Sequence, residues 1–169
     1  MSKSERPRKP REPQHVVVGL DYSEDSERAL YASFETIRGN LATLHVLAVA
    51  EGDGPPLPPE LTEDTKRRFL EEAHATLDRY VGERLETLGS DTIDRARLRT
   101  AVDFGDAAER ILALADAVDA DLIVVGPRGK TGMDRLLVGS VADQVLRHAP
   151  CSVLIARVRH TGARGRSMH

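Results

Sequence analysis

The sequence lacks the features of disulfide-bonded, membrane-spanning and secreted proteins. Its 169 residues include a single cysteine, Cys151, which excludes an internal disulfide and any zinc site built from several cysteines. No apolar run approaches the ~20 residues that a helix needs to cross a bilayer, and the basic N-terminus has no apolar core of a secretory signal. We expect one domain and a cytoplasmic protein.

The net charge of -3 hides an acidic body between two basic ends. Residues 1–14 carry a net charge of +3 and residues 157–169 carry +4, which leaves -10 for the rest of the chain. Neither end forms a dense basic block, so we expect solubilising tails and no contact with nucleic acid or membrane. The predicted organisation is a disordered basic tail over residues 1–14, a folded domain over 15–158 and a disordered tail over 159–169.

Short apolar runs alternate with segments of helical periodicity through the folded domain. The apolar runs are typical of parallel strands buried on both faces. This alternation predicts a single-domain α/β fold, an open parallel sheet with helices on both faces, and ligands bind such sheets at the carboxyl ends of the strands. Strands are predicted over residues 15–20, 43–49, 97–102, 121–125 and 151–156, and helices begin near Ser23, Asp64, Asp106 and Ser140.

The stretch from Gly126 to Ser140 lies between the fourth predicted strand and the last helix. Because glycine is costly in chain entropy, the cluster of Gly126, Gly129 and Gly139 indicates unusual backbone angles or backbone close to a ligand. A Gly-Ser pair that opens a helix presents backbone N–H groups where phosphate binds. A surface turn without a ligand is the alternative. We expect valine at Gly126 or Gly139 to abolish binding while the fold survives.

The spacing Gly126-x2-Gly129-x9-Gly139-Ser140 is similar to the nucleotide-binding signature of ATP-binding universal stress proteins. The whole run from Gly126 to Ala156 resembles that family, as do Val16–Ser23 and Leu44–Val46, so the resemblance covers about residues 15–158. It implies a Rossmann-like, five-stranded parallel sheet in the order 3-2-1-4-5. It also implies a homodimer paired through the last strand, Cys151–Ala156, which light scattering would test.

The resemblance further implies ATP, with Mg²⁺, held mainly by backbone. Carried over residue by residue, it places the adenine and ribose beside the first two strands, the ribose side at the end of the fourth, and the phosphates at the glycine loop and helix start. The residues so implied are Gly19, Leu20, Asp21 and Val46 for adenine and ribose, Val125 and Gly126 for the ribose side, and Arg128, Gly129, Gly139, Ser140 and Val141 for phosphate. Many ATP-binding members have a hydroxyl residue at Ala142, so only its backbone amide is expected to contribute.

Three of these residues have competing interpretations. Asp21 could accept hydrogen bonds from ribose or hold Mg²⁺ through phosphate, or it could close a local Asx-type turn. Ser140 could bind phosphate or merely cap its helix, and these two roles are compatible. Arg128 could lend positive charge to the phosphates or lie in solvent. The same two interpretations apply to Lys130, the first of the nine residues between Gly129 and Gly139.

Two tempting motifs fail. Gly129-Lys130-Thr131 resembles a Walker A loop, but that motif needs a glycine where this chain has Val124. His148 and Cys151 stand three residues apart like a base and a nucleophile. His148 falls in the last turn of a helix, where positive charge suits the dipole, and Cys151 begins a buried strand. We therefore expect no catalytic residues.

The predicted function is a nucleotide-dependent regulatory module in the stress response, with an unknown protein partner, that is at most a slow ATPase. Hydrolysis needs a positioned water, a base and charge neutralisation, whereas the sequence offers backbone amides, one candidate acid and two basic residues. The first alternative is an adenylating enzyme of the related ATP-pyrophosphatase group, whose Ser-Gly-Gly-x-Asp-Ser loop is absent after the first strand. The second is a structural dimerisation module with an empty site, which the intact glycine spacing disfavours.

Overall fold

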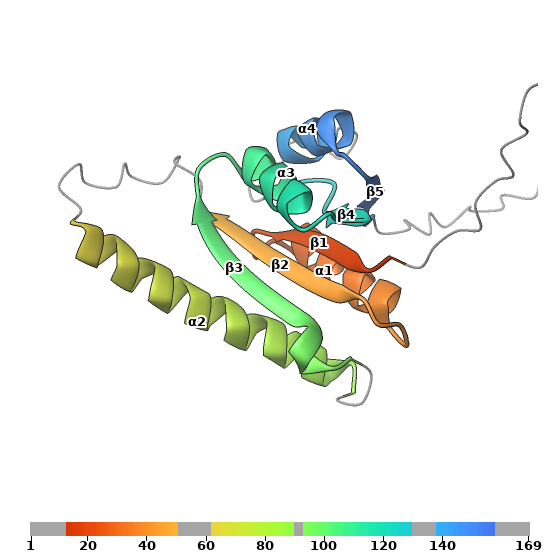
Figure 1. Cartoon of the computed structure of the whole chain (residues 1–169), viewed down its shortest axis with the longest axis horizontal. Helices are drawn as coiled ribbons and strands as arrows, with labels where there is room; N and C mark the ends of the chain where they lie inside the picture. The colour runs from red at the N-terminus through yellow and green to blue at the C-terminus, as the bar shows by residue number, and fades with distance from the viewer. Residues whose placement is uncertain (1–12, 51–61, 90–92, 130–137, 158–169) are drawn as a thin grey trace, which may run out of the picture.

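The computed structural model describes residues 13–50, 62–89, 93–129 and 138–157. They form a five-stranded parallel sheet in the order β3-β2-β1-β4-β5, which confirms the predicted topology (Figure 1). The strands are β1 (His15–Leu20), β2 (Thr43–Ala50), β3 (Leu98–Phe104), β4 (Leu122–Val125) and β5 (Ser152–Ile155). The helices are α1 (Glu24–Ile37), α2 (Glu63–Thr87), α3 (Ala107–Ala117), α4 (Ser140–His148) and the short 3-10 helix η1 (Arg95–Arg97).

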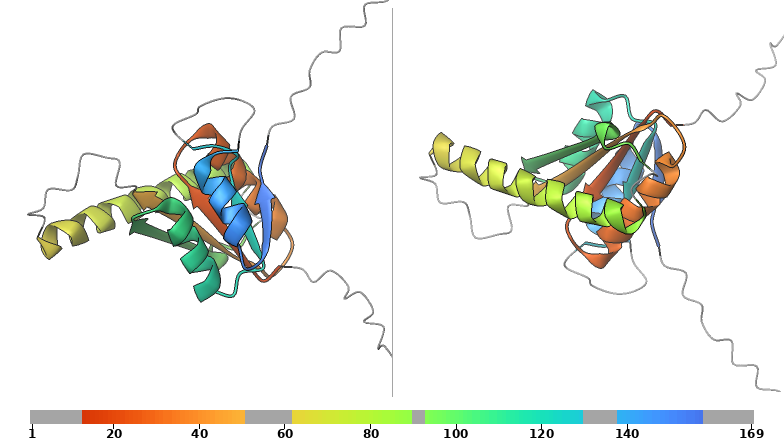
Figure 2. Two further views of the ribbon diagram at one scale, coloured as in Figure 1. Left: turned by 90° about the horizontal axis from the view of Figure 1, so that it is seen from above. Right: turned by 90° about the horizontal axis from the view of Figure 1, so that it is seen from below.

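Two hydrophobic clusters lie on opposite faces of the sheet. Helices α1 and α2 cover one face, whereas α3 and α4 cover the other, as the two views in Figure 2 show. Successive residues of β1 point to opposite faces, so Val16 and Val18 join the first cluster and Val17 joins the second. This double burial explains why the strands read as continuous apolar runs.

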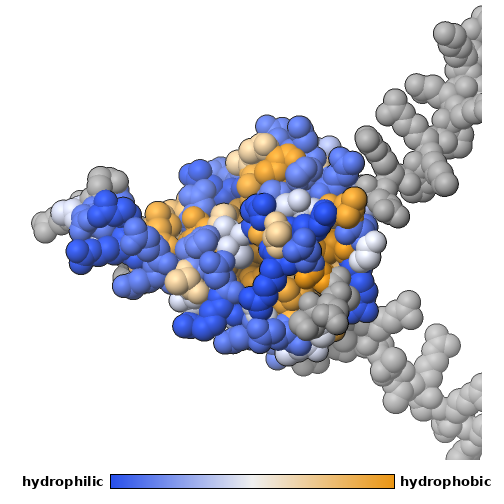
Figure 3. All heavy atoms as spheres, turned by 60° about the horizontal axis from the view of Figure 1, so that its bottom comes forward, coloured by the Kyte–Doolittle hydropathy of each residue, from blue (hydrophilic) through white to orange (hydrophobic). Residues whose placement is uncertain are grey.

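Helix α2 is buried only along its second half. Leu77, Val81 and Leu85 are core residues. Leu70 and Ala73 lie at the same helical spacing but are only partly buried, because the first half of α2 extends past the sheet (Figure 1). This projecting end has a largely hydrophilic surface in Figure 3.

Side-chain caps start two of the helices as the sequence predicts. Ser23 caps α1 by accepting a hydrogen bond from Ser26 N at 3.2 Å, and Asp106 caps α3 by accepting one from Glu109 N at 2.9 Å. Helix α4 differs, because its N-cap is Gly139, which has no capping side chain. Ser140 is the first helical residue, so the alternative role of Ser140 as a cap is wrong.

Strand β5 lies at an edge of the sheet. Within the described residues it pairs with β4 alone, and its residue Leu154 is 38% exposed. An apolar strand edge favours pairing with another chain. The homodimer through this strand stays a prediction. The tails predicted over residues 1–14 and 159–169 also stay a prediction, because residues 1–12 and 158–169 lie outside the described residues. No helix in the described part of the chain is long and apolar enough to cross a membrane.

A histidine pair joins β1 and β2 near the amino-terminal ends of the strands. His15 Nδ1 and His45 Nε2 are 3.2 Å apart and share a hydrogen bond. Partial burial lowers the pKa of the His45 imidazole, and the neighbouring positive charges of His15 and Arg99 lower it further. Protonating both rings would place two charges at this contact, so the pair favours at least one neutral imidazole.

Because of the histidine pair, we expect the folded protein to be less stable in acid. In the unfolded chain the pKa of His45 returns to about 6.5, so below that pH the unfolded chain binds more protons than the folded one. The free energy of unfolding should therefore decrease as the pH falls from about 6.5 to the lowered folded-state pKa. Urea denaturation at about pH 7.5 and at about pH 5 should show a smaller acid-induced decrease in His45→Gln than in the original protein.

The matched control is His148→Gln, which alters an exposed histidine on the last turn of α4. This variant should keep the full acid-induced decrease. An equal decrease in His45→Gln and the original protein would show that His45 does not contribute to the pH dependence.

Candidate functional site

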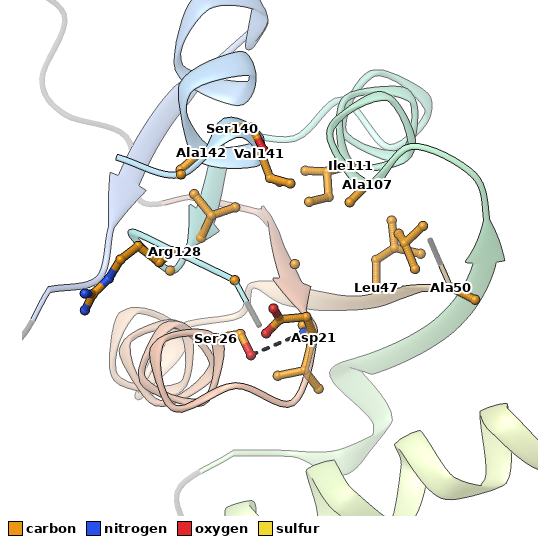
Figure 4. Close-up of a pocket in the computed structure, with 17 residues that line it drawn as sticks. Asp21, Ser26, Leu47, Ala50, Ala107, Ile111, Arg128, Ser140, Val141 and Ala142 are labelled. Carbon is orange, nitrogen blue, oxygen red and sulfur yellow. Dashed lines mark hydrogen bonds between the residues drawn. The ribbon is translucent and has the colours of Figure 1, made fainter. Parts of the chain in front are cut away.

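A cavity of about 480 Å³ opens at the carboxyl end of the sheet (Figure 4). Its walls come from the ends of β1, β2 and β4, the start of α3, and the start of α4. This volume lies in the range of small-molecule sites. The cavity lies where the connections from β1 and β4 leave the sheet in opposite directions, the usual ligand position in open α/β sheets.

The structure brings together eleven of the twelve residues that the sequence analysis selected. They come from three chain segments that are distant in sequence and adjacent at this edge of the sheet. The eleven lining residues are Gly19, Leu20, Asp21, Val125, Gly126, Arg128, Gly129, Gly139, Ser140, Val141 and Ala142.

Val46 is the exception, because it does not line the cavity. Its side chain is fully buried in the cluster beneath α1 and α2, on the far face of the sheet. Its neighbour Leu47 faces α3 and lines the cavity instead. Because adjacent strand residues point to opposite faces, an assignment shifted by one residue moves the side chain to the wrong face.

The apolar half of the cavity is the part that the sequence analysis missed. Besides Leu47, this half is formed by side chains at the end of β2 and on the first two turns of α3. A largely apolar wall of this kind suits a flat ring such as a nucleobase. The additional lining residues are Val49, Ala50, Ala107 and Ile111 here, and Ser26 on the polar side.

Asp21 lies at the polar half and also shapes its own turn. Its Oδ1 accepts hydrogen bonds from Ser23 N at 3.0 Å and from Ser23 Oγ at 2.5 Å. Its backbone N–H donates to Ser26 Oγ at 3.2 Å. The local Asx-type turn is therefore present, and the residue nevertheless lines the cavity. Tyr22 follows with a left-handed φ of 63°, an unusual conformation for a bulky residue, and its ring meets Tyr80 of α2 edge-on at 5.0 Å.

The glycines of the loop lie close to other parts of the protein, most closely at Gly126. A Cβ at Gly126 would lie 2.7 Å from the backbone carbon of Asp25, and one at Gly129 would lie 2.8 Å from Asp21 Oδ2. A Cβ at Gly139 would lie 3.3 Å from Arg128 Cα. The glycines let the loop pack directly on the first turn of α1 and on the start of α4. Gly126 therefore has a packing reason to be glycine, in addition to the expected closeness of its backbone to a ligand.

The start of α4 is the second polar feature of the cavity. Gly139 N donates to Pro127 O at 2.7 Å, which ties the helix start to the loop after β4. The next N–H groups, beginning with that of Ser140, belong to the first turn, which has no intrahelical acceptors for them. Such a helix start attracts phosphate. Lys130 and Arg135 belong to the segment between Gly129 and Gly139, and both lie outside the described residues.

Arg128 lines the cavity, but its guanidinium does not point into it. Figure 4 shows the side chain turned away from Asp21, Ser140 and Val141. Its Nε donates to Asp25 Oδ2 at 3.0 Å. The expected approach of this side chain to phosphate is therefore not seen in this structure.

The geometry gives no support to a catalytic pair of His148 and Cys151. His148 Nδ1 contacts Gln144 O at 2.9 Å within its own helix, and Cys151 Sγ contacts Ser152 O at 3.6 Å. Burial is the main cause that raises the pKa of the Cys151 thiol, which disfavours the nucleophilic thiolate. In the described ranges, no group of three or more His, Cys, Asp or Glu could hold a metal ion.

Comparison with known proteins decides the family. The model of the Universal stress protein family matches residues 12–157. The chain belongs to the universal stress protein family. A solved universal stress protein, UspA from Lactobacillus plantarum, has 25% sequence identity and a TM-score of 0.68 over 88% of this chain and 100% of that chain.

Two further universal stress proteins are similar to this chain. One from Methanocaldococcus jannaschii is 43% identical over 61 residues, a match that spans 36% of this chain and 36% of that protein. Another was solved in complex with cAMP. It is 25% identical with a TM-score of 0.64, over 87% of this chain and 99% of that chain.

In this universal stress protein, Ala142 occupies the third position of α4. Its side chain is buried in the cluster beneath α3 and α4, and the residue also lines the cavity. A methyl group offers no hydrogen bond, so any polar contact from this position comes from the backbone N–H.

Proposed function

We propose that this universal stress protein binds an adenine nucleotide in the cavity and acts as a nucleotide-dependent regulatory switch. The observation that carries the proposal is a single cavity with an apolar wall at one end and the start of α4 at the other. An adenine nucleotide has the same two-part character, an apolar ring and a charged phosphate end. The relative solved with cAMP supports an adenine nucleotide in general.

The lining residues fit such a ligand in a defined order. The base would lie against Leu47 and Ile111, and the ribose near Asp21. The phosphates would accept hydrogen bonds from backbone N–H groups at Ser140 and Val141. ATP with Mg²⁺ is the proposed form, because the Asp21 carboxylate and phosphate oxygens are ligands that Mg²⁺ prefers.

The regulatory part of the proposal follows from where the cavity walls come from. The loop from Gly126 to Gly129 and the start of α4 belong to the segment that leads into β5, the proposed dimer strand. A ligand that binds one arrangement of this segment better than another shifts the population toward it. Nucleotide binding would in this way change the contacts offered to a partner.

Identifying a co-purified ligand tests the binding directly. Denaturing the purified protein should release an adenine nucleotide that mass spectrometry identifies. Adding ATP and Mg²⁺ at about 100 times the dissociation constant should stabilise the ligand-free protein by about 2.7 kcal/mol, which raises the melting temperature by roughly 5–10 °C for a domain of this size.

The same preparation separates the alternatives. If no nucleotide is released and ATP with Mg²⁺ causes no thermal shift, the binding proposal is contradicted and a structural module is favoured. Steady release of inorganic phosphate would indicate a slow ATPase, whereas pyrophosphate release with an acceptor would indicate an adenylating enzyme.

A further inference from the structure

A nearly buried carboxylate connects α1 to the glycine loop. Asp25, in the first turn of α1, is only 8% exposed. Its Oδ1 accepts a hydrogen bond from Arg28 Nη1 at 2.7 Å, and its Oδ2 accepts one from Arg128 Nε at 3.0 Å. A buried carboxylate is costly unless charged donors compensate it. One of these donors comes from the same helix, and the other comes from the loop after β4.

The Asp25–Arg128 pair stands next to the tightest backbone contact of the site. Gly126 packs so closely on α1 that a Cβ would lie 2.8 Å from Asp25 O and 3.0 Å from Ser26 N. The loop is thus held to the first turn of α1 at two points, by backbone packing at Gly126 and by the guanidinium of Arg128. Between them lies Pro127, whose carbonyl oxygen accepts the hydrogen bond from Gly139 N.

These contacts form a continuous path from α1 to the start of α4. Asp25 holds Arg128, the Arg128 segment carries Pro127, and Pro127 orients Gly139, the N-cap of α4. The cavity walls at Asp21 and at Ser140 therefore keep their relative position through this path. A basic residue in a phosphate loop would be expected to bind phosphate, but the Arg128 guanidinium here pairs with the carboxylate of Asp25.

We propose that Arg128 is a positioning residue that acts through Asp25, and that it sets the geometry of the nucleotide cavity without contacting the phosphates. This inference rests on the proposed adenine-nucleotide site. It makes Asp25, which does not line the cavity, as important for affinity as Arg128. It also predicts that losing Arg128 affects ligands with one phosphate and with three phosphates equally.

A double-mutant cycle with Arg128→Gln and Asp25→Asn tests the proposal. Each single variant should lose about tenfold in affinity for AMP and for ATP, the effect of one lost hydrogen bond to a charged group. The double variant should lose no more affinity than the single variant that binds the nucleotide less tightly. If Arg128 contacts phosphate, its loss instead grows from AMP to ATP and persists in the Asp25→Asn background, which would overturn the proposal.

Arg28→Gln is the matched control. Arg28 also pairs with Asp25, but it lies on α1, and within the described residues its ion pairs are with Glu24 and Asp25 of the same helix. Its replacement should lower stability as Arg128→Gln does, because both leave the same carboxylate with one donor fewer. It should leave nucleotide affinity within about twofold of the original protein. Equal loss of affinity in both arginine variants would show that only the burial of Asp25 matters.

A ligand-free measurement keeps the inference testable if no nucleotide binds. Hydrogen exchange should show that the Gly139 amide, which donates to Pro127 O, exchanges faster in Arg128→Gln than in Arg28→Gln. Arg128→Lys, which keeps the charge without the planar guanidinium, serves where Arg128→Gln fails to fold. Unchanged Gly139 exchange in these variants would overturn the positioning role, independently of the fate of the nucleotide proposal.

Discussion

Replacing Gly126 with valine is expected to lower the free energy of unfolding by about 3 kcal/mol or more, as overpacking of a closely packed site does. The Cβ alone would lie 2.7 Å and 2.8 Å from the backbone carbon and oxygen of Asp25. Backbone of a first helical turn cannot rotate away as a side-chain end does. The loop after β4 must separate from α1, and ligand binding should be lost as a consequence. Urea denaturation of the ligand-free protein measures the effect.

Gly82→Ala is the control for glycine replacement in general. Gly82 lies inside α2, where the nearest atoms to an added Cβ belong to the Arg95 side chain at 3.6 Å, an ordinary contact. Alanine in a helix interior should raise stability by about 0.5–1 kcal/mol. A Gly126→Val protein that is as stable as the original but unable to bind would refute the packing explanation. It would restore the view that this glycine is small in order to admit the ligand.

The fold could be predicted because its signals are local and repeated. Continuous apolar runs such as Val16–Val18, with helical stripes between them, indicate a sheet covered on both faces without any knowledge of contacts. The continuous apolar pattern does not indicate, however, which way each side chain of β2 points. Where both faces are apolar, no alternation distinguishes Val46 from Leu47, and only the packed structure assigns one to each cluster.

The errors in the site come from contacts between distant segments. The direction of Arg128 depends on Asp25, 103 residues earlier in the chain, which the local sequence around the loop does not reveal. Ile111 belongs to the apolar stripe of its helix. Because residues at the rim of a cavity are as apolar as the core residues beneath them, the sequence does not distinguish Ile111 from a core residue. The three glycines of the signature line the cavity, and Gly126 also packs against the first turn of α1, which its own segment does not reveal.

The second large effect is expected from Ser140→Pro, which should weaken binding of phosphorylated ligands by roughly 10- to 100-fold. Proline removes the Ser140 N–H, and a hydrogen bond to a charged group contributes about 1.5–3 kcal/mol. The fold should tolerate it, because proline suits the first helical position. Gly139 already has φ -64° and ψ 160°, the extended conformation that precedes proline. Isothermal titration with AMP and ATP measures the loss.

Two controls distinguish phosphate binding by the Ser140 backbone N–H from binding by its hydroxyl: the variant Ser140→Ala and the ligand adenosine. The alanine variant removes only the hydroxyl, so its loss of affinity for ATP should be smaller than that of the proline variant. Adenosine has no phosphate and should bind both variants as it binds the original protein. If Ser140→Pro binds ATP normally while Ser140→Ala does not, the hydroxyl and not the backbone holds the phosphate. The start of α4 would then act through its serine side chain, and the backbone account of this end of the cavity would be wrong.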